Sequence, residues 1–526
     1  MKKKNAASLL PWAVLAASYL FAVLVYALIG RHNVNADMAS EMVLADLLNR
    51  EGGFLSPNWY YSTELRVISP VPVYQLALRI FPGNWHMART LSLAILLAAF
   101  AASAVYMGRG AGCVIPAVYA AAACMLPVSE VHRFLFTGGG FYIMYVTAAF
   151  LLIGLVLRLR RQKGRIIRLL LIGAGSLVCG LTGVRMPMIV GLPLGMACAL
   201  DMWDALREAD TLRGALADER APMAFGAGVS LAAMLAGYVV NSRVLSGIYH
   251  FESFGGMEMG SLNLPRLGDQ IQYLINFFGL SEGMPLLSMG GIVDMMTLCV
   301  CVLMAVAVYT LMKRRAELAG GMRLLVCFAV FAVALGMFLN LVTGTTENRY
   351  AVGYYMAGAF MLVVLVFVLL HIMRCRMAWL RTLAMLAVAG VFFLQSAAFV
   401  RSYMQHEENE HEAAAAWLTE NGYTQGFASF WNGNILTELS DGQLDMYIYG
   451  ELNEPELTPW LQETRHLSEA PEGKAFVFVG YLETFAEGIP CMQEDKLVWT
   501  SPYGSKVYEY GSAQEVIELQ RTLGAN

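Results

Sequence analysis

Long apolar segments alternate with short polar loops over the first 400 residues. A window of about 19 residues picks out eleven of them, at 8-30, 87-107, 112-128, 139-157, 166-182, 186-203, 222-246, 290-312, 322-343, 350-372 and 377-400. The first is about 20 residues long, enough for roughly 30 Å of hydrocarbon, and it lacks a small-residue cleavage site. The pattern predicts an all-α polytopic membrane domain over residues 1-400, with about 11 transmembrane helices and long outer loops at 31-86 and 247-289.

Residues 401-526 have a different pattern. The stretch "NEHEAAAAWLTENG" is typical of a helix, whereas "GFASF", "LDMYIY", "AFVFVGY", "KLVWTS" and "KVYEYG" are short apolar or alternating runs typical of strands. Asp441-Gly442 is a typical turn sequence. We therefore expect a small C-terminal α/β domain.

Composition and charge placement support this topology. Hydrophobic residues make up 57% of the chain and charged residues 14%, and the mean hydropathy is +0.54, which is typical of a multi-pass membrane protein. Basic residues gather in every second loop, starting from the N-terminal tip, and the positive-inside rule then predicts a cytoplasmic N-terminus and an extracytoplasmic C-terminal domain in a cell membrane. No basic stripe with interleaved aromatics indicates a nucleic-acid partner.

The loop after the first apolar segment carries paired acids. Asp37 and Glu41 are four residues apart and fall on one face of an expected helix at the outer interface. Two carboxylates at this place suit a general base or a metal ligand acting on a lipid-borne substrate. The alternatives are acids that favour a helix N-terminus through its dipole, or a solvated loop.

Further polar and aromatic residues occur on the same side. "NWYYSTELRV" places Tyr60, Tyr61, Glu64 and Arg66 where the chain returns to the bilayer. Arginines also recur at outer segment ends, where insertion does not require them, so an anionic lipid head group is one explanation and pairing with a nearby acid is the other. These arginines are Arg89, Arg133, Arg185, Arg243 and Arg349. The 247-289 loop, with His250, is either a lid over a substrate cavity or an interfacial helix that closes a gap.

These features together resemble the membrane glycosyltransferases of the GT-C superfold, which include protein O-mannosyltransferases and the lipid A aminoarabinose transferase. The resemblance covers about residues 8 to 400 and depends on the acid Asp37 early in the first outer loop, the arginine in "ENRYAVGYY" and the number of spans. Met38 follows Asp37 where those families have Glu, and no "WWDYG"-like stretch occurs, which argues against an oligosaccharyltransferase.

The resemblance implies sugar transfer from a polyprenyl phosphate donor to a hydroxyl of a glycan, lipid or protein acceptor at the outer face of the bilayer. Asp37 is then the candidate general base, assisted by Glu41, and Arg349, Arg133 and Arg185 are candidates to bind the donor phosphate. Glu64, Arg66, Tyr60, Tyr61 and His250 are candidates for substrate binding. No cofactor is certain, and a divalent cation (Mg or Mn) is optional in this scheme. The alternative function is a transporter or flippase of lipid-linked saccharides.

Overall fold

The computed structural model describes residues 6–63, 65–138, 140–209, 211–251, 263–281, 283–343, 347–373, 377–404, 410–486 and 488–525. Most of them belong to helices. The longer helices of the first 404 residues are α1 (Ala6–Ile29), α2 (Ala36–Glu51), α3 (Val71–Ile80), α4 (Trp85–Ala111), α5 (Val114–Cys124), α7 (Ile143–Leu157), α8 (Arg165–Gly180), α9 (Leu192–Glu208), α11 (Arg220–Arg243), α12 (Leu267–Phe277), α13 (Met289–Lys313), α14 (Gly320–Thr343), α16 (Met356–Ile372) and α17 (Ala378–Tyr403).

Each of the eleven apolar segments overlaps one of these helices. Within the described residues, eight helices are long and apolar enough to cross a bilayer by length and composition, while Val114–Cys124 and Met356–Ile372 are apolar but shorter. The all-α polytopic prediction is confirmed, and the number of about eleven spans stays a prediction. α16 is buried along nearly its whole length, so its continuous apolar sequence reflects a central place in the bundle.

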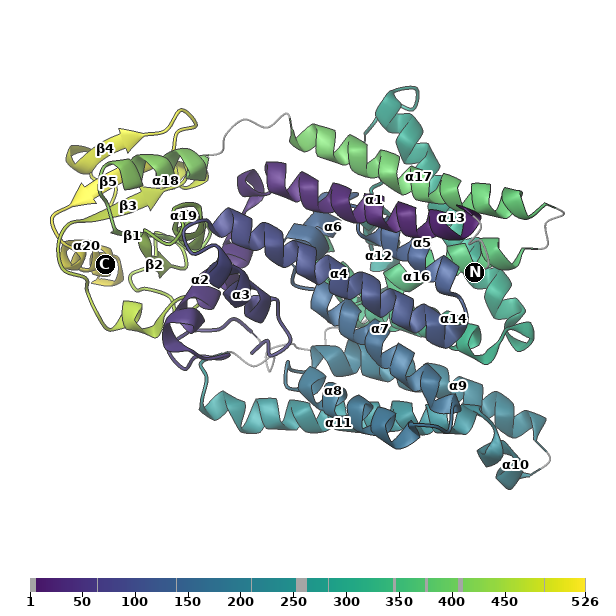
Figure 1. Ribbon diagram of the computed structural model, residues 1–526. Helices are drawn as coiled ribbons and strands as arrows, with labels where there is room; N and C mark the ends of the chain where they lie inside the picture. Colours follow the sequence, from purple (N-terminus) through teal and green to yellow (C-terminus); the bar gives the residue numbers. More distant parts are fainter. Residues whose placement is uncertain are drawn as a thin grey trace.

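The long helices run roughly side by side, as Figure 1 shows, and the N-terminus and the C-terminal domain lie at opposite ends of the bundle. α2 and α3 sit between the bundle and the C-terminal domain. The first outer loop therefore folds into helices that separate the membrane part from the domain beyond it.

The C-terminal domain is built on a five-stranded sheet. Its strands are β1 (Gln425–Ser429), β2 (Asp445–Tyr449), β3 (Ala475–Val479), β4 (Leu497–Thr500) and β5 (Lys506–Tyr510), in the order β2-β1-β3-β5-β4. β1 pairs in parallel with β2 and β3, whereas β5 is antiparallel to both β3 and β4. The helices α18 (Glu410–Glu420), α19 (Gly433–Leu439) and α20 (Ala513–Arg521) complete the domain. All five strand segments and the first helix were predicted, and the small α/β domain is confirmed.

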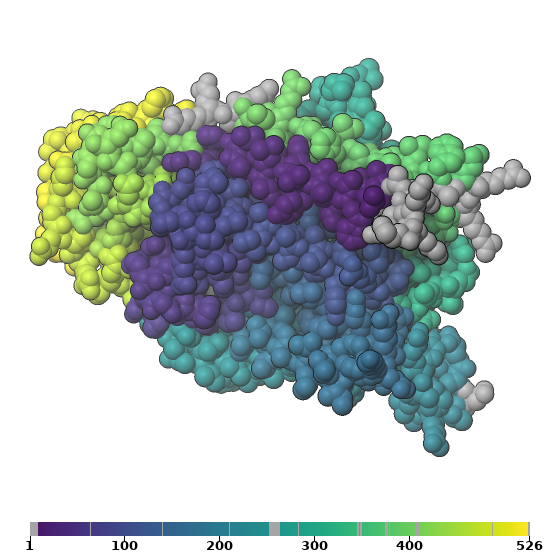
Figure 2. All heavy atoms as spheres, viewed as in Figure 1, coloured from purple at the N-terminus to yellow at the C-terminus, as the bar shows by residue number. Residues whose placement is uncertain are grey.

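A buried ion pair joins this domain to the bundle. Both ends of the Arg89 guanidinium fork, at the start of α4, donate to the carboxylate of Glu438 on α19 at 2.6 Å, and the Arg89 side chain is 2% exposed. The predicted turn at Asp441-Gly442 is present, with positive φ at both residues, and the Asp441 carboxylate accepts the Trp85 backbone N–H at 2.7 Å. In Figure 2 the C-terminal residues lie directly against residues of the first hundred positions. Because a bidentate buried pair has little freedom of geometry, it sets the domain's position on the bundle.

Candidate active site

The helix α2 positions the two acids that the sequence singled out. Asn35 caps it, accepting the Met38 backbone N–H at 3.0 Å, and Gly52 ends it in a left-handed conformation with φ of 78°. Asp37 lies in the first turn, where the helix dipole favours a negative charge. Glu41 follows one turn later on the same face.

Two cavities meet at Asp37. The larger, of about 320 Å³, is lined by Asp37, Ser62, Thr63, Arg66, Phe134, Leu135, Phe141, Tyr142, Arg185, Tyr350, Tyr354 and Trp460. The smaller, of about 50 Å³, is lined by Asp37, Ser40, Glu41, Leu44, Trp59, Tyr61, Ser62, Arg66, Ser69, Val71 and Leu461. Asp37, Ser62 and Arg66 border both cavities. The volume of the larger cavity, and its mostly apolar wall with a few converging polar groups, are typical of a small-molecule site.

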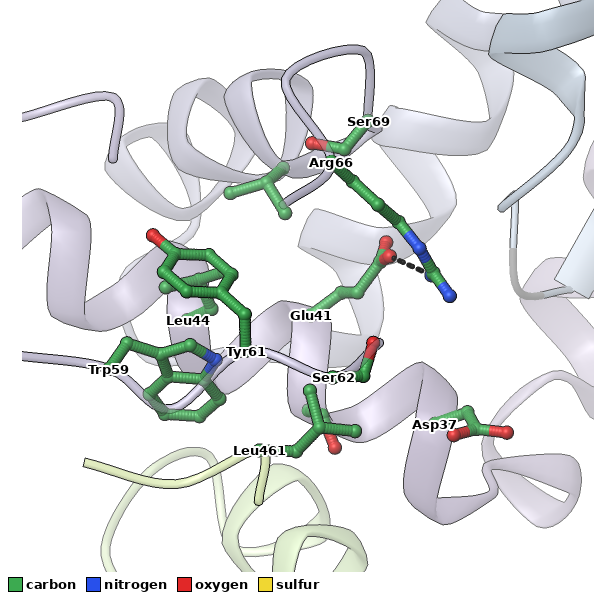
Figure 3. A pocket seen from close by; sticks show the side chains of 11 residues that line it. Asp37, Glu41, Leu44, Trp59, Tyr61, Ser62, Arg66, Ser69 and Leu461 are labelled. Carbon is green, nitrogen blue, oxygen red and sulfur yellow. Dashed lines mark hydrogen bonds and ion pairs between the residues drawn. The ribbon is translucent and has the colours of Figure 1, made fainter. Parts of the chain in front are cut away.

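Glu41 and Arg66 form an ion pair in the wall between the cavities. The Arg66 guanidinium donates to Glu41 Oε1 at 3.0 Å, as Figure 3 shows. Burial raises the pKa of Glu41 to about 7, although the nearby Arg66 and Arg89 charges act in the opposite direction. Glu41 Oε2 is buried and accepts no hydrogen bond within the described part of the chain. Glu41 therefore changes charge near neutral pH, next to Asp37.

Arg185 provides a second cationic group on the larger cavity. It donates a hydrogen bond to the Tyr142 hydroxyl, and its guanidinium carbon lies 5.3 Å from the centre of the Tyr142 ring and 5.4 Å from that of Tyr354. Gly353 permits this packing, because a Cβ there would approach the Tyr142 ring to 2.6 Å. Arg66 stacks similarly, 5.2 Å from the centre of the Phe141 ring. Two arginines held over aromatic faces, with tyrosine hydroxyls beside them, form a surface suited to a phosphate group.

One π-helical turn borders the larger cavity, and a second begins two residues after Arg185. They span Arg133–Gly138 and Pro187–Gly191, and Phe134 and Leu135 of the first turn reach the cavity wall. Such turns are rare and occur often at functional sites. The three glycines at 138–140 and Pro187 are the sequence features that accompany them.

The other predicted phosphate ligands have different surroundings. Arg133 donates to both carboxylate oxygens of Glu130, at 2.9 and 2.6 Å, and to the Asn33 carbonyl at 3.2 Å, and it does not line either cavity. Arg349 lies in the short helix α15 (Asn348–Gly353), beside the cavity residue Tyr350, and its side chain lies outside the described part of the structure.

The predicted substrate-binding residues are divided between the cavities and the loops. Tyr61 lines the smaller cavity, where its hydroxyl accepts the Ser56 backbone N–H at 2.9 Å. Tyr60 packs against His250 instead, with ring centres 5.2 Å apart, and neither residue lines the two cavities. Glu64 lies outside the described residues, as do residues 252–262 of the 247-289 loop. The amphipathic end of that loop forms α12.

Sequence reasoning missed several cavity residues. Ser62 lies two residues before Glu64 and Tyr354 five residues after Arg349, so proximity to a predicted residue was an available signal for these two. Phe141 and Tyr142 lie eight and nine residues after Arg133, and proximity does not single them out. Trp460 comes from the C-terminal domain, and no pattern in the sequence connects it with Asp37.

The described residues include no group of three or more His, Cys, Asp or Glu side chains placed to hold a metal ion. Asp37 and Glu41 are the acids nearest the cavities, and Glu41 is bound to Arg66. A divalent cation bound by Asp37 and Glu41 would thus have to compete with Arg66 for the Glu41 carboxylate.

Comparisons with known proteins place this architecture among solved structures. No protein-family model and no curated protein matches the chain. The structure of ArnT from Cupriavidus metallidurans bound to undecaprenyl phosphate is similar, with a TM-score of 0.55 and 12% identity over 95% of this chain and 98% of that one. The structure of the same ArnT in the apo state has the same TM-score and identity, over 97% of this chain and 98% of that one.

The oligosaccharyltransferase of Archaeoglobus fulgidus in complex with Zn and sulfate also matches, at a TM-score of 0.49 and 15% identity, over 94% of this chain and 72% of that one. At such identities a structural likeness indicates the fold alone. The likeness to ArnT spans almost the whole of both chains and supports the assignment of the fold. The chain has the GT-C fold that the resemblance in sequence predicted.

Proposed function

We propose that this protein is a membrane glycosyltransferase that moves a sugar from a polyprenyl phosphate donor to an acceptor hydroxyl at the outer face of the membrane. The observation that carries the proposal is the larger cavity, which brings the carboxylate of Asp37 together with the guanidinium groups of Arg66 and Arg185. That combination supplies a proton acceptor and an anion site at one place, which sugar transfer from a phosphate donor requires.

The proposed reaction has one step. The acceptor oxygen attacks the anomeric carbon, the bond between that carbon and the phosphate oxygen breaks, and the acceptor proton passes to Asp37. The phosphate leaves with the bonding electron pair, so its charge grows as the bond breaks. Arg185 and Arg66 stabilise that charge, and no external acid is needed. Arg349, on the helix that contributes Tyr350, is a further candidate for the same phosphate.

Two features make the cavity suitable for a lipid-linked substrate. Phe134, Leu135 and Phe141 give it an apolar wall, and Arg185 lies five residues after the end of the apolar helix α8. A polyprenyl chain would then lie along the bundle while its phosphate reaches the arginines. The hexosyl or pentosyl nature of the sugar and the kind of acceptor, whether glycan, lipid or protein, belong to the same proposal.

Sugar transfer by the purified protein tests the proposal. Wild type and Asp37→Asn are incubated with a panel of radiolabelled polyprenyl phosphate sugars and a membrane extract as the source of acceptor. We expect one donor to yield labelled product, and the Asn variant to lose at least about 10³-fold in rate, because it keeps its shape but cannot accept the proton. Asp46→Asn is the matched control, since Asp46 lies on the same helix and pairs with Arg50 at 3.0 Å.

The assay also separates the alternative function. If wild type transfers no sugar from any donor but exposes labelled lipid on the other leaflet of reconstituted vesicles, the protein is a flippase and the transferase proposal fails. If Asp37→Asn and Asp46→Asn both retain activity, the transferase remains but the base lies elsewhere.

A further inference from the structure

The segment from Thr458 to Thr464 of the C-terminal domain reaches into the candidate active site. It contributes Trp460 to the larger cavity and Leu461 to the smaller one, and Figure 3 shows Leu461 approaching Ser62 and Trp59 from the C-terminal domain. Asp37 borders both cavities, so this segment faces the candidate base from the domain side.

Hydrogen bonds on both sides hold the segment in place. The fully buried Gln462 side chain accepts the Ile448 backbone N–H at 3.0 Å and donates to the Ile448 carbonyl at 2.9 Å, so that it pairs with β2 as a neighbouring strand would. On the other side, the Tyr60 N–H donates to the Gln462 carbonyl at 2.9 Å and the Thr464 N–H to the Asn58 carbonyl at 2.9 Å. The segment therefore links the sheet to the first outer loop.

Leu461 adopts a backbone conformation that its side chain disfavours. Its φ is 48°, in the left-handed region that branched and bulky residues rarely occupy. The buried Asn434 holds it there by donating to the Leu461 carbonyl and to Ser40 Oγ on α2, both at 2.9 Å. Local strain of this kind persists only where the surroundings determine it, and it clusters at functional sites. Its effect here is that the neighbouring residues Trp460 and Leu461 line different cavities.

Trp460 is the aromatic residue that the C-terminal domain contributes to the larger cavity. The rings of Phe141, Tyr142 and Tyr354 pack on the two cavity arginines. One face of each of these rings is therefore covered by a guanidinium group. A sugar attached to a phosphate bound at Arg66 and Arg185 must present its anomeric carbon close to Asp37. An indole ring combines a large apolar face with a polar edge and loses little conformational entropy, which suits the C–H face of a sugar ring.

We propose that the transferred sugar ring stacks on Trp460, which makes Trp460 a specificity-determining residue for the donor sugar. The inference rests on the proposed function and deepens it. The bundle binds the lipid phosphate, and the C-terminal domain selects the sugar. Exchange of the segment between related chains would then change the accepted sugar without changing the lipid carrier.

The test compares two affinities in Trp460→Ala, Trp460→Tyr and wild type. One is the KM for the active polyprenyl phosphate sugar, and the other is the inhibition constant of bare polyprenyl phosphate, which has no sugar. We expect Trp460→Ala to raise the KM about tenfold while the inhibition constant changes less than about twofold, and Trp460→Tyr to restore most of the affinity. Trp431→Ala is the control, because Trp431 belongs to the same domain, is 49% exposed and lines neither cavity.

Two results would overturn the inference while the proposed function stands. One is an unchanged KM in Trp460→Ala, and the other is an equal weakening of both affinities, which would show that Trp460 supports the cavity as a whole. The Trp460→Tyr variant keeps an aromatic ring in the segment, so a folding defect confined to the Ala variant does not decide the outcome. A wild type that transfers no sugar removes the proposed function and this inference together.

Discussion

Four arginines at the end of the bundle next to the C-terminal domain fall into two groups that the sequence does not distinguish. Arg89 and Arg133 are each bound in a bidentate manner by a carboxylate, Glu438 and Glu130 respectively. Arg185 and Arg66 instead line the wall of a cavity that also contains Asp37. All four guanidinium groups lie over an aromatic ring, so the place at the cavity, and not the stacking, separates the groups.

The two groups differ in what the positive charge of each guanidinium interacts with. A guanidinium whose fork is filled by a carboxylate has its charge compensated and fixes two pieces of backbone relative to each other. A guanidinium at the wall of a cavity can present N–H groups to a ligand that enters that cavity. Arg66 is intermediate, because its partner Glu41 has a pKa near 7 and so pairs as a full charge only above neutral pH.

The largest expected effect comes from breaking the pair that joins the domain to the bundle. Arg89→Leu leaves the buried Glu438 carboxylate without its partner, and we expect the free energy of unfolding to fall by about 3–5 kcal/mol. Thermal unfolding in detergent and proteolysis of the C-terminal domain measure this loss. The double variant with Glu438→Leu should regain part of it, since no charge then remains buried.

Glu130→Gln is the matched control for that prediction. Glu130 is half exposed, with 53% of its side-chain surface accessible, and exposed pairs contribute about 1 kcal/mol or less. An equal loss in Glu130→Gln and Arg89→Leu would show that burial does not separate the two pairs.

The second effect concerns the cavity group. Arg185→Gln removes a charge that we assign to the donor phosphate, and we expect kcat/KM for sugar transfer to fall about 100-fold with little change in unfolding temperature. Arg133→Gln should lower kcat/KM much less, because its fork is filled by Glu130. The reverse order of the two variants would return Arg133 to the phosphate site and contradict the division into two groups.

The smallest effect is a change in pH dependence at the intermediate pair. The pKa of Glu41 is about 7 in the folded protein and near 4.5 in the unfolded chain, so the folded state holds an extra proton between these values. Stability contributed by Glu41 therefore falls as the pH rises from about 4.5 to about 7 and is level above that. Glu41→Gln should remove this slope, together with any inflection near pH 7 in the rate of transfer.

Unfolding of the wild type and Glu41→Gln at several pH values, alongside initial rates, measures both effects. A slope that persists unchanged in Glu41→Gln would show that another group titrates in this range.

Much of the fold followed from sequence pattern alone, and several of the residues that line the two cavities were among the candidates from the sequence. Each of the eleven hydrophobic runs overlaps a helix, because a bilayer demands apolar side chains over a fixed length. Short apolar or alternating runs marked the five strands, and β3 is buried at all five positions. The spacing of Asp37 and Glu41 placed them on one helical face. The recurrence of arginine at predicted outer segment ends made Arg185 a candidate, and the stretch "NWYYSTELRV" made Arg66 one.

Tertiary structure alone decided which arginines are compensated and which residues close the cavity. Arg89 and Glu438 are 349 positions apart, and Trp460 reaches Asp37 only because the C-terminal domain docks on α2. Local periodicity reports contacts within a helix or strand, where neighbours are set by the backbone repeat. Contacts between distant segments depend on how whole elements pack, and so the division between arginines that line the cavity and arginines that do not exists only in the folded chain.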